Sequence, residues 1–198
     1  MNSNPIIGTA MDGGYYAGRI RIEEQTFALI VAPKELGEIK PSIWIPGYKA
    51  VPGAMSYNDG LSNTRAMAES GSELAKQILD LRTGDAADWY LPSQDELEIV
   101  YRNLKPTTDK NYCWARSGIN LSAIEPTRPY TPDFPAQTLA EAFQAGGDQA
   151  FEEARYWSST QHSDPDYAWC QGFDGGGQHC HDTYSELRAR AVRRLEIQ

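Results

Sequence analysis

The sequence predicts an α+β domain with antiparallel sheets, two main helices and a long irregular insertion. Alternating apolar residues occur in the first and last parts of the chain, a pattern typical of strands. Helical spacing occurs in two neighbouring segments between residues 63 and 104, so the helices are grouped in sequence. Residues 105–150 follow neither period. Strands that flank grouped helices are typical of α+β proteins.

Length and composition fit a single folded domain spanning residues 1–198. The chain is 40% hydrophobic and 11% aromatic, which is ample material for one core. A net charge of -9 argues against nucleic-acid binding, because neutralising phosphates requires a clustered positive surface. Three cysteines, Cys113, Cys170 and Cys180, cannot all pair within one chain, so free thiols are expected.

No targeting or membrane segment is expected. Residues 1–5 lack a basic start followed by an apolar run, so no signal peptide is predicted. No stretch approaches the roughly 20 apolar residues that a membrane span needs, so membrane insertion is not expected. The sequence therefore predicts a soluble protein that is synthesised in a cytoplasm.

The N-terminal region is expected to form a hairpin followed by turns. Apolar residues on either side of a polar stretch predict two strands between Tyr15 and Ala32. Four prolines surround Ile43 to Ile45, which favours one short edge strand among turns. We treat residues 1–56 as a candidate region for attachment to other proteins.

Two helices are predicted next. Apolar or small residues recur at three- and four-residue steps between Asn63 and Leu81, and Gly84 lies just past the end as a stop. The second helix begins after Ser93, which forms a capping box with Glu96. Its apolar face is expected to contain Leu97, Val100, Tyr101 and Leu104.

The 105–150 insertion contains five prolines and one short helical hint at Leu139 to Phe143. A loop of this length usually has a function or is held by its own side chains. Strands return between Tyr156 and Ile197, and the first and last strands are expected to pair. The segment Gln178 to Glu186 has no helical or strand period, which favours a contact surface over core.

Several residues of the closing third have ordinary structural interpretations. Hydroxyl side chains at Ser158 to Thr160 are expected to satisfy backbone groups at a strand end. The arginines between Arg188 and Arg194 are expected to pair with acidic residues on an edge strand. Large aromatic side chains are expected to be core, each contributing about 1.5–3 kcal/mol of burial: Trp89, Tyr90, Trp157 and Trp169.

Four sequence blocks, at residues 58–64, 88–97, 156–160 and 190–194, resemble the Lcl carboxy-terminal-domain-like family in order and spacing. The resemblance covers about Tyr57 to Leu195. It implies a C-type-lectin-like fold, shared with sulfatase-modifying enzymes and phage tropism determinants. The Asp-Gly-x-x-Asn-Thr block and the Arg-Ala-Val-Arg-Arg ending look most like phage and prophage members of the family.

The resemblance implies a phage or prophage tail-associated module that recognises a host surface glycan or protein without covalent chemistry. Its other partners would be virion tail proteins, its location the virion, and a homo-oligomer is expected. Aromatic, histidine and acidic residues within 161–186 suit such contacts, because they combine stacking area with adaptable hydrogen bonds. The candidate ligand-binding residues are Tyr167, Trp169, Gln171, Asp174, Gln178, His179, His181, Asp182 and Tyr184.

Metal sites and cofactors are not expected. His179 and His181 with Cys170 and Cys180 have zinc-binding chemistry, but adjacent ligands do not easily surround one tetrahedral ion. Asp164, Asp166, Asp174 and Asp182 have the oxygen ligands of calcium, but acidic loop residues are commonly just solvated. Isolated His162 is expected to be a solvated loop residue.

Two rival functions and one elaboration remain open. A virion decoration or fibre-tip subunit would pack against its neighbours without binding a receptor. An enzyme resembling the sulfatase-modifying relatives would depend on Cys170 or Cys180, although neighbours on a strand point to opposite faces and no catalytic residue is predicted. The terminal segment also contains residues reachable from asparagine codons by adenine mutagenesis, which fits a diversified receptor surface.

Overall fold

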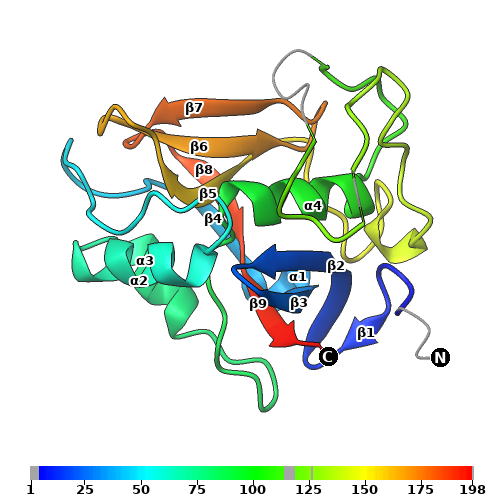
Figure 1. The fold of residues 1–198 in the computed structure, drawn as a ribbon, viewed down its shortest axis with the longest axis horizontal. Helices are drawn as coiled ribbons and strands as arrows, with labels where there is room; N and C mark the ends of the chain where they lie inside the picture. Colours follow the sequence, from blue (N-terminus) through cyan, green and yellow to red (C-terminus); the bar gives the residue numbers. More distant parts are fainter. Residues whose placement is uncertain (1–4, 114–118, 126, 198) are drawn as a thin grey trace.

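The computed structural model describes residues 5–113, 119–125 and 127–197 and confirms an α+β fold (Figure 1). Residues 1–4, which bear on the signal-peptide prediction, lie outside these ranges. No described helix is both long enough and apolar enough to cross a membrane.

The strands are β1 (Ala10–Met11), β2 (Gly14–Ile22), β3 (Gln25–Val31), β4 (Glu38–Ser42), β5 (Arg155–Gln161), β6 (Tyr167–Gly172), β7 (Gln178–Asp182), β8 (Leu187–Arg190) and β9 (Val192–Glu196). The helices are α1 (Lys34–Gly37), α2 (Gly60–Glu69), α3 (Glu73–Leu79), α4 (Gln94–Leu104) and the 3-10 turn η1 (Glu141–Phe143).

The first sheet has four strands in the order β1-β2-β3-β9. β2 and β3 form the predicted hairpin, and β9 pairs antiparallel with β3, with Ile30 opposite Arg193. The predicted pairing between the N-terminal strands and the end of the chain is therefore confirmed. A register shift at Gly18 brings β2 close to α4, since a Cβ atom there would lie 2.6 Å from the Asn103 amide nitrogen.

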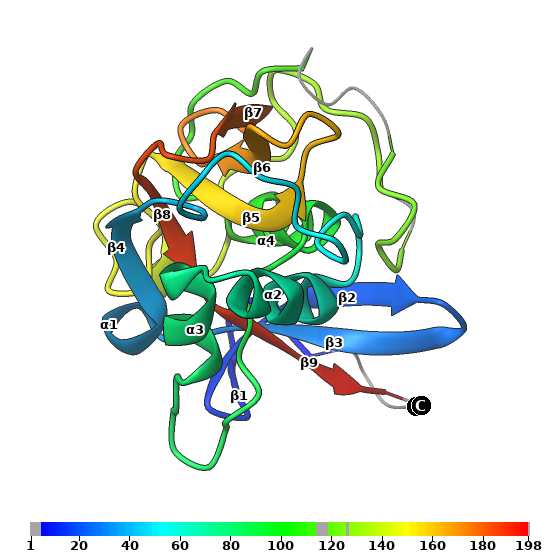
Figure 2. The same cartoon turned by 90° about the vertical axis from the view of Figure 1, so that its left-hand side faces the viewer.

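The second sheet has five strands in the order β4-β8-β5-β6-β7. Its pairs are antiparallel, as predicted, except β5 and β8, which run parallel at Tyr156 and Arg188. Only Ala191 separates β8 from β9, and the two follow a nearly continuous path from one sheet to the other (Figure 2). The two sheets are thereby joined into one fold.

The short strand predicted at Ile43 to Ile45 is displaced toward the N-terminus. The strand is β4, and the chain bends at Trp44, which is fully buried. The Trp44 indole Nε1 donates to the Ser158 carbonyl at 2.8 Å, so this side chain anchors the following loop to β5. Burial of the Trp44 side chain in the core therefore decides the backbone conformation at this residue, although tryptophan favours strands.

The single helix predicted from Asn63 to Leu81 is in fact two helices, α2 and α3. Gly71 separates them with φ of +96°, a left-handed conformation that glycine adopts at little cost. Ser72 then caps α3 by accepting from the Ala75 amide. In the sequence, the helical spacing of apolar residues continues through Gly71, because α2 and α3 bury side chains in the same core. These side chains include Met67, Leu74 and Ile78.

Helix α4 begins with the predicted capping box of Ser93 and Glu96. Its predicted apolar face is buried, and so are four polar residues of its first part, Gln94, Asp95, Glu96 and Glu98. The insertion covers two of these residues, because the Asn120 side chain donates to Asp95 O at 3.0 Å and to Glu98 Oε2 at 2.6 Å. Side chains therefore hold the described part of the insertion, as predicted.

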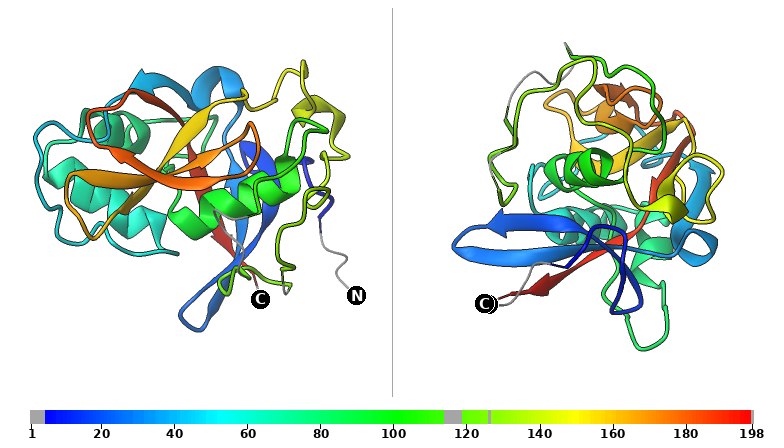
Figure 3. Two further views of the ribbon diagram at one scale, coloured as in Figure 1. Left: turned by 90° about the horizontal axis from the view of Figure 1, so that it is seen from above. Right: turned by 90° about the vertical axis from the view of Figure 1, so that its right-hand side faces the viewer.

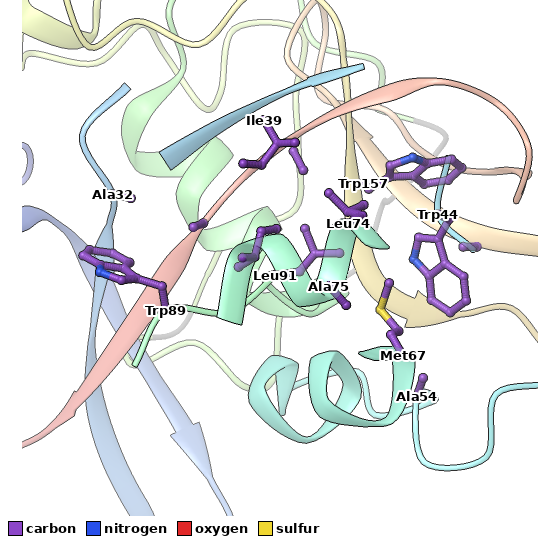
Figure 4. Close-up of a cluster of buried hydrophobic side chains, with 14 of the residues drawn as sticks. Ala32, Ile39, Trp44, Ala54, Met67, Leu74, Ala75, Trp89, Leu91 and Trp157 are labelled. Carbon is purple, nitrogen blue, oxygen red and sulfur yellow. The ribbon is translucent and has the colours of Figure 1, made fainter. Parts of the chain in front are cut away.

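Two groups of buried side chains form the core. One surrounds α2 and α3 and contains Trp44, Trp89 and Trp157, as Figure 4 shows. The other surrounds α4, where Tyr101, Tyr156 and Phe173 pack edge to face. The predicted burial of Trp89, Tyr90 and Trp157 is confirmed, whereas Trp169 is only partly buried.

The closing arginines pair with acids, as predicted, but their strand assignment needs correction. Arg188 and Arg190 both bind Glu38, at 2.8 and 3.3 Å. Arg194 pairs with Asp59 at 2.8 Å. β8, which carries Arg188 and Arg190, is not an edge strand, since it lies between β4 and β5, and the Arg190 side chain is fully buried. β9, which carries Arg193 and Arg194, is the edge strand of the first sheet, as predicted. These arginines consequently join elements inside the fold.

Candidate binding surface

The β6–β7 hairpin carries most of the residues predicted to bind a ligand. β7 is a regular strand at the edge of the sheet, so the expectation that 178–186 lacks strand structure is wrong for Gln178–Asp182. The pairs Tyr167–Asp182 and Trp169–Cys180 are cross-strand neighbours. Alternation along the strands places these pairs on one face and the histidines of β7 on the other.

Gln171 and Gln178 lie opposite each other in the hairpin and are buried against α4, which corrects their assignment to a contact surface. The Gln178 side-chain nitrogen Nε2 donates to the Gln94 backbone carbonyl at 3.1 Å, and Gln94 Nε2 donates to Gln178 Oε1 at 3.3 Å. Gln171 Nε2 donates to Gly176 O at 2.7 Å. These amides hold the hairpin and its turn in place.

His179 and His181 are partly buried on the face of the hairpin that carries Ala168 and Cys170. Burial lowers the pKa of both imidazoles, and the positive charge of Arg155 lowers it further. Both side chains therefore favour the neutral form. Strand geometry separates them from the tyrosines of the opposite face.

Asp174 lies in the 172–177 turn, at the other end of the hairpin from Tyr167. Five residues of strand span about 16 Å, so Asp174 cannot share a small site with Tyr167. The turn is tight: Gly176 has φ of +76°, and a Cβ atom there would lie 2.3 Å from the Tyr101 ring. The sequence predicted that Asp174 and Tyr167 belong to one binding site, but the fold places them at opposite ends of the hairpin.

Tyr48, Asp182 and Tyr184 form a contact cluster at the end of β7. The Tyr48 hydroxyl donates to Asp182 Oδ2 at 2.8 Å, and the two tyrosine rings lie 4.8 Å apart between centroids. The Tyr184 backbone amide donates to Asp182 Oδ1 at 2.8 Å. Both rings are about half exposed, at 55% for Tyr48 and 44% for Tyr184. This cluster, together with Tyr167 across the strand from Asp182, is called the tyrosine patch below.

The loop that presents Tyr48 is held from both sides. Gly47 adopts φ of +84°, and its amide donates to the Tyr184 hydroxyl at 2.5 Å. Gln161 of β5 accepts from the Val51 amide and donates to the Lys49 carbonyl, both at 2.8 Å. This loop lies beside the end of the β6–β7 hairpin (Figure 3). The tyrosine patch is therefore built on fixed backbone.

Two further rings lie near the tyrosine patch. His162 packs against Trp169 at 5.3 Å and against Tyr167 at 6.3 Å between centroids, both edge to face. His162 Nδ1 also accepts from the Asp164 amide at 3.0 Å. This histidine is therefore a structural neighbour of two candidate residues, whereas the sequence suggested an isolated loop residue.

Sequence reasoning missed Tyr48, because its contact with Asp182 joins residues 134 positions apart. The only signal in the sequence was a tyrosine in a segment rich in proline and glycine, which is typical of a surface loop. Four of the nine predicted residues, Tyr167, Trp169, Asp182 and Tyr184, come together with Tyr48 at this end of the hairpin. The rest are buried, lie on the other face or lie at the far turn.

Two further observations concern the residues considered for metal binding and nucleophilic chemistry. Within residues 5–113, 119–125 and 127–197, no three histidine, cysteine, aspartate or glutamate side chains are grouped to hold a metal ion. Cys170 is buried, and burial raises the pKa of its thiol to about 12. A thiol with this pKa remains protonated near neutral pH, which makes it a poor nucleophile. Cys180 is exposed on the edge strand.

The chain belongs to the Lcl C-terminal domain family, whose model matches residues 44–193. The match begins earlier than the resemblance in the sequence blocks indicated and includes the loop that carries Tyr48. The family gives a coarse link to recognition and adhesion. No curated protein matches the chain in sequence.

Proposed function

We propose that the protein is a phage or prophage tail-associated module that binds a host surface glycan or protein through the tyrosine patch. The supporting observation is the contact between Tyr48, Asp182 and Tyr184, which exposes two rings beside a carboxylate on fixed backbone. Such rings offer large contact area at low entropic cost, and the carboxylate and hydroxyls orient a polar partner. The role is noncovalent and needs no cofactor.

Attachment to the rest of the tail would use parts of residues 1–56 outside the tyrosine patch. β2 and β3 are paired with β9, so these strands are integral to the domain. The short edge strand β1 and the exposed Leu36 of α1 offer contact surface in this region. A homo-oligomer is part of the proposal, and light scattering of the purified chain measures it.

The experiment that tests the proposal is binding of the labelled protein to intact candidate host cells. A Tyr48→Ala/Tyr184→Ala variant should bind at least about tenfold more weakly, since exposed aromatic residues often dominate such contacts. Tyr112→Ala is the matched control, because Tyr112 is also 51% exposed but lies beside the 172–177 turn. Equal loss in the control, or unchanged binding in the double variant, would refute the proposed surface.

Glycosidase and protease treatment of the cells distinguishes a glycan from a protein partner. A chelator in the same assay tests whether a divalent ion is required. Failure of every cell type to bind, together with a stable oligomer, would favour a structural virion subunit. The enzymatic alternative predicts that Cys170→Ala or Cys180→Ser abolishes function while the protein stays folded, and the proposal predicts neither effect.

A further inference from the structure

A cavity separate from the tyrosine patch lies between β2, α4 and the insertion. This cavity measures about 450 Å³, and no residue of the tyrosine patch lines it. Its walls include Tyr16 and Gly18 from β2, Ile99 from α4, and Ile124 and Phe134 from the insertion. Cavities that hold small organic ligands usually measure about 300–1,000 Å³ and are mostly apolar. Its size and lining therefore suit a small organic molecule.

The cavity is basic within an acidic protein. The chain carries a net charge of -9, yet Arg19, Arg102 and Arg128 line this one cavity together with a single acid, Glu125. Arg19 pairs with Glu125 at 2.7 Å. The Arg128 side chain is exposed and makes no ion pair with another described residue. One arginine is thus left available to an anion at the cavity mouth.

Arg102 adds a buried positive charge to the wall. Its side chain is only 6% exposed and is fixed by Glu98 at Nε, by the Arg128 carbonyl at Nη1 and by the Tyr130 ring 4.5 Å away. Its Nη2 atom is buried and has no hydrogen-bond partner among the described residues. Glu98 offsets the charge of this guanidinium, so Arg102 supplies a fixed polar group in the wall and Arg128 supplies the net positive charge of the cavity. An unsatisfied donor of this kind is uncommon in folded proteins.

We infer that this cavity binds a small organic carboxylate with an apolar body. The carboxylate would lie against the exposed Arg128 guanidinium, whose planar fork suits a carboxylate. The apolar body would pack between Ile99 and Phe134. A single negative charge fits better than a phosphate dianion, since Glu98 and Glu125 already offset two of the three arginines.

The test is titration of the full chain with phenylacetate and with its neutral match, phenylacetamide, followed by NMR and calorimetry. Phenylacetate should bind at least about tenfold more tightly, as expected for a hydrogen bond to a charged group. Inorganic phosphate is the third probe and should bind more weakly than phenylacetate. Equal binding of acid and amide, or no binding of the acid at millimolar concentration, would overturn the inference.

Three variants locate the binding. Ala136→Phe fills the mouth of the cavity from an exposed position and should abolish binding without loss of stability. Arg128→Gln should weaken phenylacetate binding about tenfold and leave phenylacetamide unchanged. Arg82→Gln is the control, because Arg82 is exposed and donates to the carbonyls of Leu79 and Leu81, away from the cavity. Wild-type affinity in both Ala136→Phe and Arg128→Gln would refute this site even if phenylacetate binds elsewhere.

Discussion

The fold contains two tyrosine–carboxylate pairs in opposite settings. Tyr90 donates to Glu96 at 2.6 Å in the core, and Tyr48 donates to Asp182 at 2.8 Å at the surface. Burial raises the pKa of the Tyr90 hydroxyl well above its usual range, and Glu96 adds to the effect. For exposed Tyr48, the hydrogen bond to Asp182 is the main cause of a raised pKa. A tyrosine–carboxylate pair therefore stabilises the core at Tyr90 and Glu96, whereas the same kind of pair faces solvent at Tyr48 and Asp182.

The difference lies in how many neighbours each carboxylate satisfies. Glu96 also accepts from the backbone amides of Ser93 at 2.7 Å and Gly60 at 3.1 Å, so it joins the starts of α4 and α2. Asp182 accepts from the Tyr48 hydroxyl and the Tyr184 amide and leaves two rings exposed beside it. Changes at Glu96 should therefore alter stability, and changes at the tyrosine patch should alter binding.

The largest effect is expected for Glu96→Gln. A glutamine has one acceptor oxygen, which cannot serve the Tyr90 hydroxyl and the Ser93 and Gly60 amides together in a fully buried site, so the variant should lose about 3 kcal/mol of unfolding free energy. Urea denaturation followed by circular dichroism measures the loss. Glu73→Gln is the control, because Glu73 is 82% exposed and should change stability little. A Glu96→Gln loss as small as that of the control would contradict the scaffold role.

Asn63→Ala should be the next most damaging change. The buried Asn63 amide accepts from Ser56 N at 3.0 Å and donates to Ser56 O at 2.7 Å, which ties α2 to the loop before it. Losing both bonds should cost about 2 kcal/mol, as measured by the same denaturation. A near-zero cost would show that this loop is held by other contacts.

Tyr48→Phe sharpens the surface side of the comparison. The variant removes only the hydroxyl that donates to Asp182, so its unfolding free energy should change by less than about 0.5 kcal/mol. Its binding to host cells should fall measurably if the Tyr48–Asp182 contact orients the partner. A stability loss comparable to that of Asn63→Ala would place Tyr48 with the scaffold.

The smallest effect concerns pH. The pKa values of His179 and His181 are lowered in the folded protein, so the unfolded chain binds more protons below the ordinary imidazole pKa of about 6.5. Stability should therefore be unaffected above this pH and fall as the pH drops through it toward the folded pKa values. A His179→Gln/His181→Gln variant should lose less stability than the wild type between pH 7 and pH 5. A parallel decline in both proteins would rule out these imidazoles as the cause.

Local rules predicted the scaffold better than the surface. Ser93 and Glu96 are three residues apart, so the start of α4 could be predicted from a short pattern. The break between α2 and α3 was missed because helical spacing continues through Gly71. The burial of Gln178 depends on α4, which lies 84 positions away in sequence. Contacts of this kind have no local signal, and Tyr48 was missed for the same reason.

The position of β9 has a consequence for how the chain is made. The N-terminal hairpin completes its sheet only when β9 arrives, as the contact between Gln25 and Glu196 across 171 positions shows. Such distant pairing slows folding, because the chain loses the conformational entropy of closing a long loop before the contact stabilises it. During synthesis the free edge of β3 therefore stays uncovered until the last strand leaves the ribosome. A nascent chain stalled before residue 192 should be protease-sensitive and prone to aggregate.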